Sequence, residues 1–363
     1  MGMTLATASG CAPPCHDDGW FQGGCPDPSE ETDSAGEGGS GDGAASGAAT
    51  TGDGSGDAGA STAGDGADDD SGGLTCPGVD ATFVSPTPTF HFLIDQGTAM
   101  ASELDGASRW DSTEAALLDP ASGVVAPRDA TTRFGLMLFR GLQAGCPSMV
   151  STPAQLGAAG SMGMLMSMEA PAGHSPVADA VTVAVAEITA DAADGPVTLV
   201  LVTAGEPSTC ATPSPIGAQL EATRQAAIGA LTTAYEAGIP SVVLAVGDDL
   251  PGEYLQALAN AGAGVQPGDP DAEALVALDE ATLVDALEQA LSIEPHCDFE
   301  LDAPVPAEAA VGCEVLVGGM PVPPSDADGW SLDDPQLLVL HGSACEALAI
   351  PQTAVELTCD CDV

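Results

Sequence analysis

Between residues 88 and 293, short apolar runs alternate with longer segments in which apolar residues recur at helical spacing. The continuous apolar runs predict strands buried on both faces, and they lie at 89–95, 133–139, 196–203 and 239–247. The helical segments lie at 108–118, 175–190, 217–238, 253–262 and 281–291. Strands that alternate with helices predict an α/β fold, a doubly wound and mainly parallel sheet with helices on both faces.

The pattern changes on both sides of this region. From residue 296 to 363, short strands and cysteines predict a small β-rich disulfide module. Residues 26–75 consist mainly of Gly, Ser, Ala, Thr and acids and cannot bury enough surface to fold. Such a linker reaches roughly 40 Å, which suits a tether. The alternative is a low-complexity insert without a role.

The predicted division of the chain is therefore as follows. Residues 1–11 are a partial lipoprotein signal, 12–25 a short cysteine-containing head, 26–75 the acidic linker, 76–295 the α/β domain and 296–363 the cysteine module.

Charge narrows the possible partners. The chain has 54 acidic residues against five arginines and no lysine, a formal net charge of -49. Such a chain cannot neutralise phosphates, so general nucleic-acid binding is excluded, and docking on anionic membranes is disfavoured. An acidic surface attracts cations or basic partners. A high-salt habitat or an acid-biased composition is the alternative explanation.

Eleven cysteines without a zinc-site spacing predict disulfides in an oxidising, extracytoplasmic compartment. The segment LATASGC, residues 5–11, resembles a bacterial lipoprotein box, which implies lipidation of Cys11 and an outer-membrane or cell-surface location, otherwise secretion. Only ten residues precede Cys11, none basic, and no apolar run of normal length is present. The alternatives are a signal truncated by a late start codon and a structural Cys11.

Three segments share the edge of the predicted sheet where ligands bind: DQGTAM (95–100), GHSPVADAV (173–181) and LVTAGEPSTC (201–210). Together, in that order, they resemble the von Willebrand factor type A domain over roughly residues 88–293. In that family a divalent cation, usually magnesium, sits above the sheet and captures a carboxylate of a partner protein. The resemblance places its ligands at Asp95, Gly97, Ala99, Ser175 and Ala204.

Three of these five positions carry no side-chain oxygen, which leaves Asp95 and Ser175. Magnesium needs hard oxygen ligands in octahedral geometry, so we expect a vestigial site and no bound cofactor. The alternative is a rebuilt magnesium or calcium site and a cation-dependent adhesin. The nearby oxygen donors that could rebuild it are Glu206, Thr98, Glu103 and Asp105.

The fold also suggests disulfide partners. Cys146 and Cys210 both follow strands at the same edge and are predicted to pair. Cys76 and Cys297 flank the domain and could pair, because the ends of this fold lie close together. Cysteines of the C-terminal module have an open connectivity, although Cys359 and Cys361 should bond elsewhere than to each other. This set comprises Cys313, Cys345, Cys359 and Cys361.

No catalytic pattern is evident, since the five histidines are scattered and no Gly-x-Ser-x-Gly elbow occurs. We therefore expect a non-enzymatic, cell-surface-tethered module that binds a protein or matrix ligand. The alternative is a structural envelope protein whose C-terminal cysteine module makes the contact.

Overall fold

The computed structural model describes residues 79–142, 145–191, 194–292, 295–305 and 312–359. Its largest sheet has six strands in the order β6-β5-β2-β7-β8-β9. All neighbours in it pair in parallel except β6, which is antiparallel to β5. The strands are β2 (Thr89–Asp95), β5 (Arg133–Leu142), β6 (Gly145–Gln155), β7 (Val197–Thr203), β8 (Ser241–Val246) and β9 (Leu275–Ala277).

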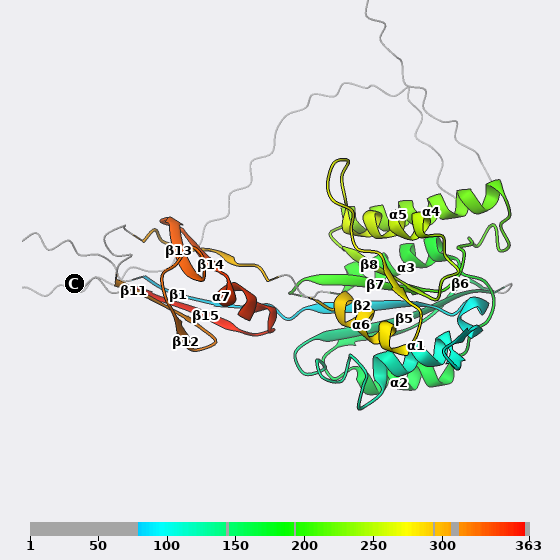
Figure 1. The fold of residues 1–363 in the computed structure, drawn as a ribbon, viewed down its shortest axis with the longest axis horizontal. Coiled ribbons are helices and arrows are strands. Elements are labelled where there is room, and N and C mark those ends of the chain that lie inside the picture. The colour runs from blue at the N-terminus through cyan, green and yellow to red at the C-terminus, as the bar shows by residue number, and fades with distance from the viewer. Residues whose placement is uncertain (1–78, 143–144, 192–193, 293–294, 306–311, 360–363) are drawn as a thin grey trace, which may run out of the picture. The chain divides into compact units, whose positions relative to one another are not determined.

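Helices cover both faces of this sheet (Figure 1). Helices α1 (Arg109–Leu118), α2 (Ala159–Met168) and α6 (Glu280–Ala290) pack on one face, and α3 (Val177–Ala190), α4 (Ala218–Glu236) and α5 (Gly252–Ala263) on the other. Every residue of β2 is buried, as a central strand covered on both sides requires. The predicted α/β fold class is confirmed.

Two strands of the large sheet were not expected. The segment of β6 contains two prolines and several Ser and Thr residues, and its exposure suits an edge strand, where proline is tolerated. β9 has only three residues, too few for a recognisable pattern. After β2 follow the short η1 (Thr98–Ala101) and a two-stranded ribbon of β3 (Glu103–Leu104) and β4 (Ala107–Ser108).

The cysteine module contains two small sheets around its own apolar core, which includes Trp330 and Leu338. One sheet has the order β1-β15-β11-β12 and the other β10-β14-β13. Their strands are β1 (Val79–Val84), β10 (Asp298–Glu300), β11 (Cys313–Val317), β12 (Met320–Val322), β13 (Gly329–Asp334), β14 (Leu337–His341) and β15 (Ala354–Cys359). The short helices α7 (Ser343–Glu346) and η3 (Ala347–Ala349) complete the module.

Strand β1 precedes the α/β sheet in the chain yet pairs along its whole length with β15. Residues 79–84 are therefore part of the module's sheet, although the predicted boundaries assigned them to the domain 76–295. The pairing is antiparallel and joins, for example, Val79 to Cys359. No local sequence pattern can indicate a pairing between residues so far apart in the chain.

The module's disulfides are Cys297–Cys345 and Cys313–Cys359. The predicted pairing of Cys297 with Cys76 is corrected, because β10 pairs with β14 and this places Cys297 beside the segment that carries Cys345. Cys11, Cys76, Cys361, the head and the linker all lie outside the described residues.

Candidate functional site

The segments after β2 and β7 and before α3 meet at the carboxyl edge of the large sheet. The backbone N–H of Gly97 donates to Oδ1 of Asp95 over 2.6 Å, and the Thr203 hydroxyl donates to Oδ2 over 3.0 Å. The Ser175 hydroxyl and the backbone of Ala204 also hydrogen-bond to this carboxylate. The three motif segments therefore converge on Asp95, and we call this group of residues the Asp95 centre.

Asp95 is completely buried, with 0% of its surface exposed. Burial raises the pKa of its carboxyl group, and the hydrogen bonds from Gly97, Ser175, Thr203 and Ala204 oppose that rise without cancelling it. Both carboxylate oxygens are thus engaged by donors of the chain itself.

The residues present do not fit a magnesium ion. Gly97, Ala99 and Ala204 supply no side-chain oxygen, and a Cβ added at Gly97 would collide with Oγ of Ser175. Within the described ranges, no group of three or more His, Cys, Asp or Glu side chains is placed to hold a metal ion. Each oxygen of Asp95 already accepts a hydrogen bond, so a hard cation would compete with these donors for the carboxylate.

The side chains predicted as alternative ligands are not directed at the Asp95 centre. Both oxygens of Glu206 accept hydrogen bonds from the Arg224 guanidinium, which also lies 5.4 Å from the centroid of the Tyr254 ring. Thr98, Glu103 and Asp105 are exposed, and none has a recorded hydrogen bond to Asp95 among the described residues. Glu206 would have to break an ion pair before it could hold a cation.

Arg109, the first residue of α1, was not expected at this edge. Its buried guanidinium donates to the carbonyl oxygen of Ala204 over 3.1 Å and to Oδ2 of Asp249 over 2.6 Å. Gly247 makes room for it, since a Cβ there would collide with the guanidinium. The Arg109 guanidinium is therefore held at the backbone of Ala204, and its charge is balanced by the carboxylate of Asp249.

An open hollow of about 730 Å³ lies at the same edge of the sheet. One of its lining residues, His174, directly precedes Ser175 of the Asp95 centre in sequence. We call it the His174 hollow, and its lining includes Leu142, His174, Pro213 and the disulfide of Cys146 and Cys210. Nδ1 of His174 lies 2.6 Å from Oγ of Ser208, and backbone hydrogen bonds in both directions join His174 to Gly141. Burial lowers the pKa of His174 and Asp179 partly offsets this, so the ring is neutral at pH 7.

The walls of the His174 hollow are held in place. The disulfide joins the end of the β5–β6 hairpin to the loop after β7, and its Cα atoms are 5.3 Å apart. The carboxylate of Asp179 accepts from the backbone N–H of Cys210 over 3.0 Å. Gly141 is required because a Cβ there would collide with the imidazole ring of His174.

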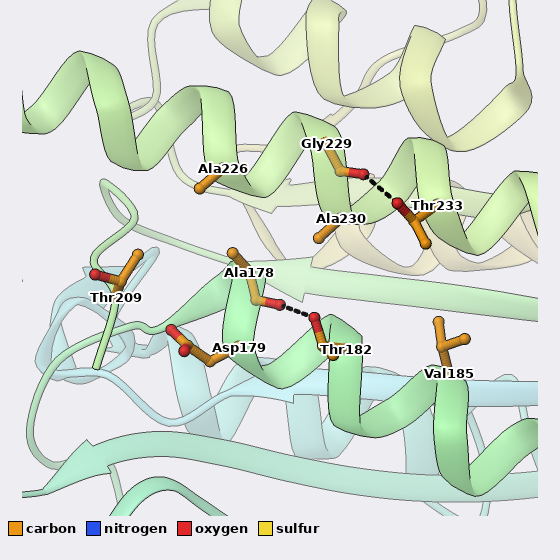
Figure 2. A pocket seen from close by; sticks show the side chains of 9 residues that line it. All are labelled: Ala178, Asp179, Thr182, Val185, Thr209, Ala226, Gly229, Ala230 and Thr233. Carbon is orange, nitrogen blue, oxygen red and sulfur yellow. Dashed lines mark hydrogen bonds between the residues drawn. The ribbon is translucent and has the colours of Figure 1, made fainter. Parts of the chain in front are cut away.

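A second hollow lies between α3 and α4 and is shown in Figure 2. The hydroxyls of Thr182 and Thr233 donate to carbonyl oxygens of their own helices, and the hydroxyl of the third threonine, Thr209, accepts from the backbone N–H of Thr212. Its one carboxylate, that of Asp179, already accepts from Cys210. This hollow therefore presents small side chains and little available polar chemistry.

Among the described residues, no helix is long and apolar enough to cross a membrane. No family model matches the sequence, and no curated protein matches it.

Several solved structures resemble the chain at low sequence identity. The pilus adhesin SpaC of Lactobacillus rhamnosus GG is 14% identical with a TM-score of 0.43, and the match covers 77% of this chain and 41% of SpaC. The manganese-loaded TRAP protein of Plasmodium vivax is 10% identical with a TM-score of 0.42, covering 72% and 94% of the two chains. A von Willebrand factor type A protein of Catenulispora acidiphila is 13% identical with a TM-score of 0.37, covering 78% and 60%. All three TM-scores are low, so the fold assignment rests on the chain's own strand order.

Proposed function

We propose that this chain is a non-enzymatic, adhesion-type binding protein of the von Willebrand factor type A kind, whose α/β domain contacts a protein or matrix ligand without a divalent cation. The main support for this proposal is the absence of side-chain oxygens at Gly97, Ala99 and Ala204, together with the hydrogen bond that each oxygen of Asp95 already accepts from the chain.

The proposed location is extracytoplasmic. Three disulfides within the described residues, Cys146–Cys210, Cys297–Cys345 and Cys313–Cys359, favour an oxidising compartment. A lipid on Cys11 and the acidic segment 26–75 would hold the folded part away from a membrane surface.

Catalysis is not part of the proposal. His174 contacts the hydroxyl of Ser208, but Ser208 is only 2% exposed and offers no accessible nucleophile. The histidine is better explained as a wall of the hollow, because its ring covers Gly141.

The test is attachment of beads coated with the full chain to collagen- and fibronectin-coated surfaces, in excess magnesium chloride and in excess EDTA. We expect attachment to at least one surface and equal attachment in both buffers. Attachment only with magnesium, lost in an Asp95→Ala variant, would place a cation at Asp95 and overturn the cation-free proposal. Attachment to neither surface would count against the matrix-binding role.

The contribution of the cysteine module needs point variants instead of truncation. Removal of residues before 296 would delete β1 and leave β15 without its edge partner. The exposed side chains Met320 and Ile350 are suitable positions, since serine there leaves the module's core intact. Loss of attachment in Met320→Ser and Ile350→Ser would favour a structural envelope protein that binds through this module.

A further inference from the structure

We propose that the His174 hollow is the contact point of this binding protein, and that it receives an aliphatic side chain from a partner segment rich in lysine and arginine. This inference rests on the proposed binding function and adds the location and chemistry of the contact.

The walls of the hollow are already ordered in the unbound chain. The disulfide of Cys146 and Cys210, the hydrogen bond from Cys210 to Asp179 and the paired backbone bonds of His174 and Gly141 fix three of its walls. A site whose walls are already ordered loses less conformational entropy on binding. At the Asp95 centre, by contrast, the carboxylate is fully buried and both of its oxygens already accept hydrogen bonds.

Exposed aliphatic side chains occur in the lining of the hollow and close to it in sequence. Leu142 lines the hollow with 37% of its surface exposed. Ile216, two residues after the lining residue Ser214, is 78% exposed. Exposed aliphatic side chains next to a concave site are typical of protein interfaces, in which a central apolar anchor fills a pocket. The uncharged imidazole of His174 adds one polar group that can hydrogen-bond to a partner backbone.

The chain is strongly acidic, which favours a basic partner. Each of the five arginines of the chain is paired with a carboxylate, and there is no lysine. The loops at the carboxyl edge carry exposed acids, and no ion pair is recorded for them among the described residues. These acids are Glu103 and Asp105 after β2 and Asp248 after β8. A basic segment would therefore be attracted to this edge, and an acidic one repelled.

Peptides of defined composition test the proposal on the full chain. A fluorescent lysine–leucine repeat peptide should bind more tightly than a lysine–serine peptide of equal charge, and a glutamate–leucine peptide should not bind. In the variant with Leu142→Ser and Ile216→Ser, we expect binding of the lysine–leucine peptide to weaken at least about tenfold, as for loss of interface anchors. The matched control, Met320→Ser with Ile350→Ser, removes equally exposed apolar side chains from the cysteine module and should change binding little.

A site-specific readout keeps the test independent of stability. The imidazole NMR signal of His174, assigned by its loss in His174→Gln, should shift when the lysine–leucine peptide binds. Equal binding of the lysine–serine peptide, or equal weakening in the control variant, would overturn the proposal in favour of general charge attraction. A shift with the glutamate–leucine peptide would overturn the assignment of a basic partner.

The outcomes also separate this inference from the function on which it rests. If beads attach to a matrix surface and the Leu142→Ser, Ile216→Ser variant attaches equally well, the binding function stands and the His174 hollow is not the contact. If the lysine–leucine peptide binds at His174 but beads attach to neither surface, the hollow stands as a peptide site and the matrix-binding function fails.

Discussion

The Asp95 centre and the His174 hollow occupy the same edge of one sheet, and consecutive residues, His174 and Ser175, belong to one each. Asp95 is fully buried, and its carboxylate accepts hydrogen bonds from backbone and hydroxyl donors of the chain. The His174 hollow is open and has a fixed disulfide wall, and its only titratable lining residue is a neutral histidine. A carboxylate at the carboxyl edge of a parallel sheet is therefore not necessarily available to a ligand.

Whether a polar group binds a partner depends on its remaining hydrogen-bonding capacity. A buried carboxylate with satisfied oxygens stabilises the loops around it but has little left for a cation. The His174 hollow is open, and its wall combines the apolar Leu142 and Pro213 with the polar side chains of His174 and Ser214. Substitutions at the disulfide wall, in strand β2 and at the hydroxyl partners of the two sites can test this contrast.

The largest effect should come from the disulfide that forms a wall of the His174 hollow. Its sequence separation is 64 residues, so loss of the crosslink through Cys146→Ser and Cys210→Ser should cost about 4 kcal/mol of the free energy of unfolding, in the chain-entropy description. Urea unfolding of the full chain measures this loss. Binding of the lysine–leucine peptide should weaken as well, because the wall is no longer fixed.

The matched control is the disulfide of Cys297 and Cys345 in the cysteine module, with a separation of 48 residues. Serine at both positions should cost a similar free energy of unfolding, because the entropic term grows only slowly with loop length. It should leave peptide binding unchanged. If both serine pairs weakened peptide binding equally, loss of stability alone would explain the effect and the hollow would lose its support.

The second effect concerns His91, which shares strand β2 with Asp95 but lacks its partners. His91 is buried, and its Nε2 has no hydrogen-bond partner among the described residues. That atom lies 4.0 Å from a carboxylate oxygen of Asp191, which Arg133 already binds. Burial lowers the pKa of His91 to about 4, against an ordinary 6.5, while Asp191 raises it and Arg133 lowers it.

The sign of the pH effect follows from these pKa values. Between pH 6.5 and pH 4 the unfolded chain binds a proton at residue 91 that the folded chain does not, so His91 lowers stability as the pH falls. The loss amounts to about 3 kcal/mol over this window, at about 1.36 kcal/mol per pKa unit. Urea unfolding across the window should show a shallower loss for His91→Gln than for wild type. An identical slope in His174→Gln and His91→Gln would contradict this assignment.

The sequence predicted much of this fold for physical reasons. Continuous apolar runs identify strands covered on both faces, which is why β2, β5, β7 and β8 were expected close to their observed bounds. The edge strand β6 has mixed polarity and two prolines, so its pattern is that of a loop. β1 is stabilised by β15, far away in sequence, and its own residues do not reveal that partner.

The candidate site was predictable in part. The convergence of the segments with Asp95, Ser175 and Ala204 follows from the order of strands in a parallel sheet. The donor from Thr203 and the guanidinium of Arg109 do not follow from spacing, since each depends on side-chain direction across elements. The partner of Cys297 likewise depended on how β10 pairs with β14, which spacing leaves open.

The smallest expected changes in stability come from removing one hydroxyl at each of the two sites. Thr203→Val removes the donor to Oδ2 of the buried Asp95, and Ser208→Ala removes the partner of Nδ1 in the more open His174. We expect Thr203→Val to lower the free energy of unfolding by about 2 kcal/mol, because it leaves an oxygen of a fully buried carboxyl group without its donor, and Ser208→Ala to lower it by about 1 kcal/mol, typical of a single neutral hydrogen bond. Urea unfolding gives both values.

The pH dependence of the Thr203→Val deficit then reports on Asp95 itself. Burial raises the pKa of Asp95, and loss of a donor to the ionised form raises it further. The folded variant therefore takes up the proton at a higher pH than the folded wild type, so its deficit should shrink as the pH falls through the folded pKa. Excess magnesium chloride should leave the deficit unchanged. A deficit that magnesium abolishes would show that a cation can replace the missing donor. Asp95 would then be accessible to a ligand, as the His174 hollow is.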